Sequence, residues 1–412
     1  MPKPERYHVA IDIGSSKVGV LIGQKSDGGM VEVVGKGLAP NRGTRKGNIV
    51  NVDATVESLK QATEEAEVMA GVEVSRAWVG VAGSDIRSVN ARGMVTVSRK
   101  DREITAQDIE RVLEAAQSAA LPSDREILHA IPQEFLVDEQ GGIRDPLGML
   151  GSRLEVTVHL VTGNTTRTKT LLTCVNRAGI EVAELVFEPL ATAEAVLTED
   201  ERELGVLLLD LGSGTTEYAL FMDGEVQHSS VLPVGAGHFT NDLAMVLRTP
   251  FSEAERIKIK NGCCLGSLVT ADEGVAVPSV AGGAPRVVAK RELAEILQPR
   301  AEELLELIKN DLAKHGYDET LRGGVVLTGG GAQLDGLLEM SEQIFDSSVR
   351  YGLPQGLGGL VDVISSPSWS TASGMLRYAI TAEEQRGRKE KRAGWSVKSM
   401  VGSLRGMFSD LL

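Results

Sequence analysis

Two short segments, far apart in the sequence, each place an acidic residue before a turn of glycine and small hydroxyl residues. Such turns let backbone N–H groups approach phosphate oxygens closely. Mg²⁺ is commonly held by one or two carboxylates together with phosphate oxygens. We therefore expect a triphosphate site in which Asp12 and Asp210 are the metal ligands. Its phosphate-binding residues are Asp12, Gly14, Ser15, Ser16 and Lys17 in the first segment, and Asp210, Gly212, Ser213, Gly214, Thr215 and Thr216 in the second.

A third glycine cluster favours a nucleotide, rather than a metal ion alone, as the ligand of this site. The apolar run that starts at Val325 leads into three glycines and an alanine before a predicted helix at about 333–340. Bare glycine backbone and a helix N-terminus both suit a nucleotide phosphate and sugar. One Asp-x-Gly turn alone is usually plain turn chemistry, but two copies and this cluster together favour binding. The cluster is Gly329, Gly330, Gly331 and Ala332.

The two acidic turns belong to an internal repeat. Residues 8–23 and 206–224 share an apolar strand, an acidic turn and a returning strand, and Asp12 corresponds to Asp210. The apolar runs are typical of strands buried on both faces of a sheet. The repeat predicts two lobes of similar design with a ligand at their junction.

Other segments have the periodicity of helices. The predicted helices are 52–71, 105–121 and 291–315. Thr105 and Asp108 resemble a capping box at the start of the second. Pro299 should kink or divide the third. Strands mixed with helices over this length indicate an α/β fold.

Composition excludes several classes of function. The chain has 412 residues, enough for at least two domains, and a formal charge of -14, which argues against nucleic-acid binding. It lacks the P-loop pattern and the dinucleotide-binding glycine pattern. Three cysteines without histidines at zinc-ligand spacing are expected to be buried hydrophobic residues. Without a membrane-spanning run or a signal peptide at Met1, the protein is expected in the cytoplasm.

The C-terminal segment differs from the rest of the chain. Residues 382–393 are a predicted polar linker, and residues 394–412 a predicted amphipathic helix. Residues 386–405 contain seven Lys or Arg but one Glu. Bulky apolar groups beside basic ones favour an anionic membrane surface over docking on the protein's own core. The expected membrane contacts are Trp395, Met400, Val401, Leu404, Arg405, Met407, Phe408 and Leu411.

The three glycine-rich motifs resemble the phosphate 1, phosphate 2 and adenosine motifs of the actin, Hsp70 and hexokinase superfamily. Within it, the segments 144–163 and 255–264 and the tail resemble the FtsA family of bacterial cell-division proteins. The resemblance implies a two-lobed actin-like ATPase fold with an inserted 1C subdomain and a C-terminal amphipathic helix. Its implied parts are 1A (1–80 and 163–203), 1C (81–162), 2A (204–238 and, with a return to 1A, 319–381) and 2B (239–318).

The resemblance also implies roles for three charged residues. Glu255 and Lys258 match positions that contact the adenosine ribose and base, although alone they would be ordinary helix-surface charges. Glu188, before Pro189, matches a water-positioning carboxylate and is the candidate catalytic residue. It fits equally well as a helix start before a proline. We therefore expect ATP and Mg²⁺ binding with at most weak ATPase activity.

The function implied is a tether that joins filaments of the tubulin-like FtsZ to the cytoplasmic face of the bacterial inner membrane at the division septum. The implied partners are the FtsZ C-terminal peptide on 2B, other division proteins on 1C, anionic lipid, and further copies of the chain in filaments. Two alternatives stay open at this point. One is a pilus-assembly scaffold of the same superfamily, and the other is a small-molecule kinase.

Overall fold

Two mixed β-sheets form the centres of two lobes in the computed structural model of the protein. It describes residues 7–26, 29–99, 101–118, 122–269, 273–282, 284–317 and 320–384. The sheet of lobe I runs in the order β11 (Glu181–Phe187), β6 (Arg76–Val81), β1 (Tyr7–Ile13), β2 (Lys17–Lys25), β3 (Val31–Pro40) and β19 (Leu357–Gly359). The sheet of lobe II runs β14 (Glu225–Leu232), β13 (Thr216–Met222), β12 (Val206–Leu211), β17 (Gly324–Thr328) and β18 (Val349–Tyr351).

The two sheets share one topology. In lobe I the central strand β1 pairs antiparallel with β2 and parallel with β6. In lobe II the central strand β12 pairs antiparallel with β13 and parallel with β17. The internal repeat is therefore confirmed, as are the three buried strands that the apolar runs predicted. Because each acidic turn follows the central strand of its lobe, both turns lie at equivalent edges of the two sheets.

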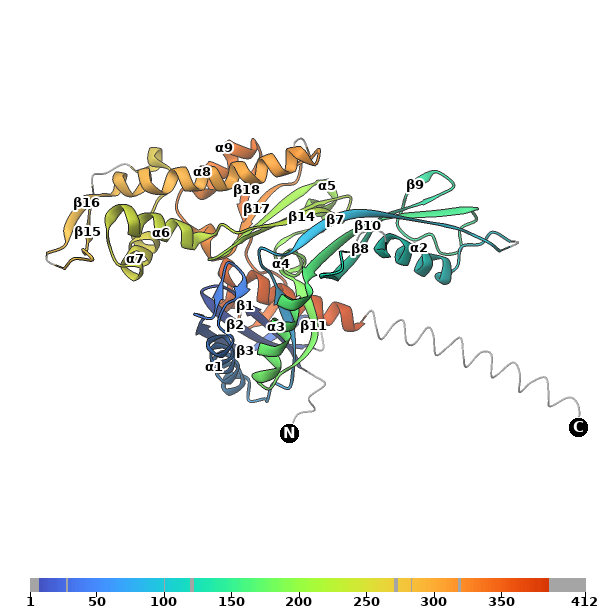
Figure 1. Cartoon of the computed structure of the whole chain (residues 1–412), viewed down its shortest axis with the longest axis horizontal. Coiled ribbons are helices and arrows are strands. Elements are labelled where there is room, and N and C mark those ends of the chain that lie inside the picture. The colour runs from blue at the N-terminus through green and yellow to red at the C-terminus, as the bar shows by residue number, and fades with distance from the viewer. Residues whose placement is uncertain are drawn as a thin grey trace, which may run out of the picture.

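Helices cover both faces of the sheet of lobe I (Figure 1). The helices α1 (Val52–Ala70) and α3 (Thr165–Arg177) share one core with β1, β2 and β6. Helix α1 begins where Asn51 accepts a hydrogen bond from Ala54 N, and it ends at Gly71 with φ of 68°. On the opposite face, a helix of residues 370–384 buries Met375, Leu376 and Ala379. This helix brings the C-terminal half of the chain back to lobe I.

An antiparallel domain is inserted between β6 and α3. It contains β7 (Arg87–Thr96), β10 (Arg153–Asn164), β8 (Arg125–Val137) and β9 (Gln140–Ile143), in this order, and α2 (Ala106–Ser118) packs on the sheet. Thr105 and Asp108 exchange hydrogen bonds at the start of α2, which confirms the predicted capping box.

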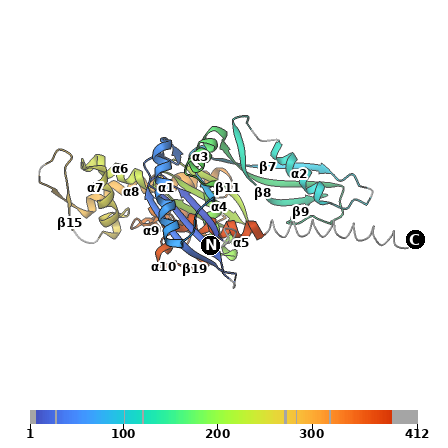
Figure 2. The same cartoon turned by 90° about the horizontal axis from the view of Figure 1, so that it is seen from below.

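A second module extends from lobe II, on the side of the molecule opposite the inserted domain (Figures 1 and 2). It holds α6 (Ala236–Leu247), α7 (Phe251–Asn261), β15 (Gly274–Val277), β16 (Arg286–Ala289) and α8 (Lys290–Lys314). The sequence predicted that Pro299 kinks or divides the last helix, and of these the division is wrong, because α8 is one helix of 25 residues. Buried leucines on both sides of Pro299, including Leu293 and Leu304, hold both halves in one core, and their burial outweighs the lost hydrogen bond.

The remaining elements are short. They are β4 (Thr44–Arg45), β5 (Asn48–Ile49), α4 (Glu188–Val196), α5 (Glu199–Leu204), α9 (Leu337–Phe345) and α10 (Val361–Ile364), with 3-10 helices η2 (Gly266–Leu268), η3 (Gly330–Gln333) and η4 (Pro367–Trp369). Among the described residues, no helix is long and apolar enough to cross a bilayer.

The predicted linker of residues 382–393 is wrong at its first three residues, and its remainder lies outside the described residues. Residues 382–384 continue the preceding helix, where Glu383 lies 3.7 Å from His8 Nδ1 and Lys25 pairs with Glu384. The predicted amphipathic helix at 394–412 lies outside the described residues. The subdomain boundaries given above stay a prediction.

Candidate functional site

A cavity of about 520 Å³ lies between the two lobes, and all three glycine-rich segments line it. Its volume is in the range of small-molecule sites. The predicted residues on its wall are Asp12, Gly14, Ser16, Lys17, Glu188, Asp210, Gly212, Ser213, Thr215, Glu255, Lys258, Gly329, Gly330 and Gly331.

The two hairpins present their turns to this cavity by the same construction. In lobe I the last paired residues are Ile13 and Val18, and in lobe II they are Leu211 and Thr216. Each turn therefore holds four residues after the strand that carries the aspartate. In lobe II, Ala236 N donates to Gly212 O at 2.9 Å, so the start of α6 fixes the turn.

Four carboxyl groups interact electrostatically in the cavity: Asp12, Asp210, Glu188 and Glu217. Burial raises the pKa of Asp12 to about 6, with Lys17 opposing and Asp210 adding to the shift. Burial raises the pKa of Glu217 to about 8, and the neighbouring Asp210 adds to it. The pKa of Glu188 is raised well above its usual value by burial and by the nearby acids. Because neighbouring buried acids resist ionising together, a cation that stabilises their charged forms would bind favourably here.

Asp210 and Lys17 are held by groups that lie far away in the sequence. Asp210 Oδ2 accepts hydrogen bonds from Thr192 at 3.1 Å and from Thr371 at 3.0 Å. These hydroxyls lower its pKa, against a larger increase caused by burial. Lys17 Nζ donates to Ser368 O at 2.5 Å and lies 4.9 Å from the centre of the Trp369 ring. Burial lowers the pKa of Lys17.

The residues present fit a hydrated Mg²⁺. Carboxylate oxygens are the ligands this ion prefers, and Asp12 and Asp210 come from facing lobes. Glu217 Oε1 is buried and has no hydrogen-bond partner among the described residues, so it is an acceptor that a hydrated cation would satisfy.

The third glycine cluster approaches Asp210 closely. Gly329 has φ of 84°, and a Cβ there would lie 2.4 Å from Asp210 Oδ1. Only glycine suits this position. The helix expected at about 333–340 is instead the 3-10 helix η3 followed by α9, which begins at Leu337. Gly336, with φ of 83°, separates the two, because that conformation interrupts a helix.

The charged pair on α7 lines the cavity from the second module. Lys258 Nζ lies 2.9 Å from Glu255 Oε2 and donates to Ala236 O at 3.0 Å. Lys258 is 8 % exposed, so it is not an ordinary surface charge. Glu188 is the first residue of α4, with Pro189 next, and it also lines the cavity. Glu188 is therefore the helix start that the sequence predicted, and its catalytic role stays a prediction.

Four predicted residues lie beside the cavity rather than on its wall. Thr216 is buried and donates to Val234 O at 2.7 Å, and Ala332 is fully buried in lobe II. Ser15 Oγ accepts from Gly47 N at 3.0 Å, and a Cβ on Gly214 would lie 2.3 Å from the same Oγ. Ser15 and Gly214 thus form a contact between the lobes.

Sequence reasoning missed several cavity residues. They are Glu217, Thr371, Ser368, Trp369 and Gly47. Glu217 lies within a buried strand, and the repeat gives it no acidic counterpart. The available signal for Glu217 was that it is an acid in β13, whose other six residues are not acidic. Ser368, Trp369 and Thr371 belong to no motif, and only the return of the chain to lobe I brings them to the site.

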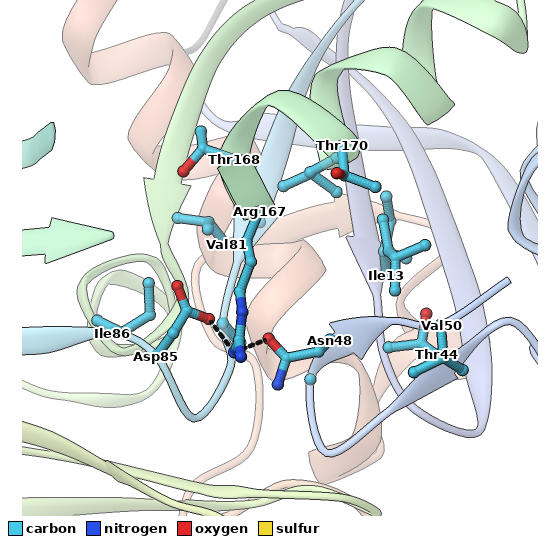
Figure 3. Close-up of a pocket in the computed structure, with 15 residues that line it drawn as sticks. Ile13, Thr44, Asn48, Val50, Val81, Asp85, Ile86, Arg167, Thr168 and Thr170 are labelled. Atoms are coloured by element: carbon cyan, nitrogen blue, oxygen red, sulfur yellow. Dashed lines mark hydrogen bonds and ion pairs between the residues drawn. The ribbon is translucent and has the colours of Figure 1, made fainter. Parts of the chain in front are cut away.

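A smaller cavity of about 250 Å³ lies next to this site and shares Ile13, Gly47 and Ala82 with it. Arg167, on α3, points to Asp85 Oδ1 at 3.2 Å and Asn48 Oδ1 at 2.6 Å (Figure 3). Because both predicted metal ligands lie outside its lining, it is not the predicted nucleotide site.

Comparisons with known proteins agree with the geometry. A family model described as cell division protein FtsA matches residues 207–374. An FtsA of Pseudomonas aeruginosa is 45% identical over 372 residues, covering 90% of this chain and 89% of that relative. The chain belongs to the FtsA family. The FtsA of Escherichia coli K12 is 38% identical, with 96% of both chains covered, and the SHS2 domain inserted in FtsA matches residues 83–162.

Solved structures place this FtsA-family protein in the actin-like fold. A PilM–PilN type IV pilus biogenesis complex has a TM-score of 0.67 at 15% identity, with 90% of this chain and 98% of that chain covered. MreB5 of Spiroplasma citri bound to ADP has a TM-score of 0.58 at 15% identity, with 93% and 98% covered. At these identities the likeness concerns the fold alone.

Proposed function

We propose that the cavity between the lobes binds ATP together with Mg²⁺. The observation that carries this proposal is the convergence of both acidic turns and the Gly329–Gly331 cluster on one cavity. The turns would hold the phosphates through backbone N–H groups and Lys17, and Asp12 and Asp210 would hold the metal. Glu255 and Lys258 would contact the adenosine. The bound Mg²⁺ would supply positive charge at the phosphates.

The test is titration of the nucleotide-free chain with ATP, with and without Mg²⁺. We expect saturable binding that weakens when magnesium is removed. No affinity for ATP in the presence of magnesium would overturn the proposal.

The same geometry supports at most weak ATPase activity. Glu188 would orient water toward the γ-phosphate, but burial and the neighbouring acids raise its pKa and so disfavour the ionised carboxylate. A protonated carboxyl is a poorer acceptor for a water hydrogen. E188Q should release phosphate more slowly than wild type, and equal rates would remove Glu188 from this role.

We further propose that this FtsA-family protein tethers FtsZ filaments to the membrane and assembles at the septum. The second module offers exposed apolar side chains on α6 and α7, namely Met245, Val246, Phe251 and Ile259. We assign this surface to the C-terminal peptide of FtsZ, and the inserted domain to other division proteins. A labelled FtsZ tail peptide should bind wild type and lose affinity for M245E. The control is E303Q on α8, and equal binding by M245E and wild type would place the peptide elsewhere.

Membrane attachment is assigned to residues 394–412, at the cytoplasmic face of the inner membrane. A chain that ends at residue 384 keeps the whole described helix of lobe I, so it is a better control than a shorter chain. It should stay folded but fail to sediment with anionic vesicles, and F408E should act in the same way. With ATP and Mg²⁺, the full chain should form filaments on these vesicles. Equal sedimentation of the shortened and full chains would contradict this assignment.

The family relationship favours the division role over the two alternatives. Relatives that share 38% to 45% identity over most of the chain are division proteins, whereas the pilus structure shares 15%. A small-molecule kinase would need an acceptor pocket with a general base, and phosphorylation of a sugar by the purified chain would restore that alternative.

A further inference from the structure

Two histidines and an aspartate meet between lobe II and the second module, away from the nucleotide cavity. His228 lies on β14, and Asp311 and His315 lie one turn apart at the end of α8. One ligand atom from each of the three residues lies within 4.8 Å of the others. The two imidazole rings face each other, with centres 4.3 Å apart and an angle of 31° between their planes.

The aspartate is fixed between the two imidazoles. Its Oδ2 accepts a hydrogen bond from His228 Nε2 at 2.7 Å and from the Tyr218 hydroxyl at 2.5 Å. Its Oδ1 lies 3.7 Å from His315 Nδ1. Tyr218 is buried in the core of lobe II, so it holds the carboxylate in place. A hydrogen-bonded partner of this kind orients a metal ligand and raises metal affinity.

The arrangement has the composition and access of a transition-metal site. Ligand atoms that lie about 2 Å from a tetrahedral zinc are roughly 3.3 Å from one another. This separation lies between the His228–Asp311 distance and the longer Asp311–His315 distance given above. Two imidazoles and one carboxylate are ligands that Zn²⁺ and its neighbours in the first transition row accept. The His228 side chain is 12% exposed, while that of His315 is 50% exposed. One ligand is thus firmly packed and another open to solvent, which provides an entry path.

We propose that His228, Asp311 and His315 bind a zinc-class divalent metal ion that fastens β14 to α8. A metal there would replace the proton between His228 and Asp311 and leave a fourth position for water.

Strand β14 also forms hydrogen bonds with the inserted domain. Its carbonyl oxygens accept hydrogen bonds from three side chains of that domain: Gln133 to Val226 at 2.8 Å, Asn90 to Gln227 at 3.0 Å, and Ser88 to Ser229. Metal at His228 therefore acts on the strand to which the inserted domain is docked. The site would make that docking more rigid.

The first experiment is titration of the metal-free full chain with Co²⁺, without nucleotide, followed by visible absorption. We expect one equivalent to produce the d–d bands of a low-coordinate cobalt site. H315A should weaken binding by more than about tenfold, and H228Q should do the same. H315A removes a half-exposed side chain, so it should fold. H8Q is the control. His8 lies in lobe I beside Glu383, so its substitution should leave the bands unchanged.

The second experiment measures the same variants with Zn²⁺. Zinc should raise the melting temperature of wild type and H8Q but not of H315A, and should slow hydrogen exchange in β14. Unchanged cobalt bands in H315A and H228Q would overturn the proposal, and so would a thiolate charge-transfer band, which would place the metal on cysteine. Failure of wild type to bind Co²⁺ or to respond to Zn²⁺ would show a hydrogen-bonded cluster only. Each result is independent of ATP binding.

Discussion

The two lobes share a backbone design but differ at the position that pairs with the aspartate. Asp12 faces Gly19 across the β1–β2 hairpin, whereas Asp210 faces Glu217 across β12–β13. Gly19 lies under the indole of Trp369, where a Cβ would be 3.1 Å from the ring. Glu217 instead lines the cavity, and its side chain is buried.

The difference teaches how a duplicated scaffold acquires two roles. Lobe I combines its acid with the cation Lys17 and closes the space behind it with an aromatic ring. The acid of lobe II lies beside a second acid of its own sheet, Glu217, and accepts hydrogen bonds from Thr192 on α4 and from Thr371 on the helix that covers lobe I. Lobe I therefore places a lysine next to its aspartate, whereas lobe II places a second acid next to its own.

The largest effect is expected when the lobe II residue is copied into lobe I. G19E would insert a carboxylate under Trp369 and beside Asp12, so overpacking and an unpaired buried charge add up to about 4 kcal/mol of lost stability. Urea denaturation measures this loss, and G19A should lie between G19E and wild type. The control is G266E, where a Cβ would lie 3.4 Å from Gln298 Oε1. Equal loss in the two glutamate variants would contradict the packing argument.

A second change removes the charge of the lobe II aspartate. D210N keeps the shape but loses the anion that accepts from Thr192 and Thr371. We expect its affinity for ATP with Mg²⁺ to fall by roughly 30- to 160-fold, or about 2–3 kcal/mol. Calorimetry checks this. D242N on α6, outside the cavity, should bind like wild type, and an unchanged affinity in D210N would mean that lobe II does not hold the metal.

A third prediction concerns pH and the inserted domain. Burial, with a smaller effect of His228, lowers the pKa of His159 to about 3, so its neutral form is the one packed in the fold. The unfolded chain binds the extra proton between pH 6.5 and 3, so stability is full above pH 6.5 and lost as pH falls. At pH 5 the buried neutral His159 therefore lowers the free energy of unfolding by about 2 kcal/mol relative to pH 7.5.

H159Q should therefore flatten the acid side of the stability curve measured by urea denaturation. Part of the slope should remain, because burial also lowers the pKa of His129 to about 4. His129 accepts a hydrogen bond from Phe187 N, which needs the neutral ring. A slope identical to that of wild type would show that His159 is hydrated.

The smallest effect should come from neutralising the lobe II glutamate. E217Q removes a buried acid with an unpartnered oxygen, so the nucleotide-free chain should gain about 1 kcal/mol in stability. The same variant should depend less on magnesium for ATP binding. E126Q alters a carboxyl outside the cavity whose Oε1 has no hydrogen-bond partner in the described part of the chain, and it should keep the full magnesium dependence. A loss of stability in E217Q would mean that the acid is charged and paired.

Local patterns predicted the skeleton of the molecule well. Apolar runs located β1, β12 and β17 because buried central strands are almost wholly apolar. The glycine turns were found because close backbone approach restricts the residue type. Prediction failed where distant packing decides: at Pro299, which a long buried face overrides, and around Trp369, which reaches the site only through the path of the chain.

The helix of residues 370–384 joins two ends of lobe I. Near its start, Thr371 donates to Asp210 inside the cavity, and at its end Lys25 pairs with Glu384. Fifteen helical residues span about 22 Å, and a helix is stiff along its axis. The helix therefore connects the last described residue, Glu384, to the hydroxyl that bonds the lobe II aspartate. A shift of this helix along its axis would move Thr371 relative to Asp210.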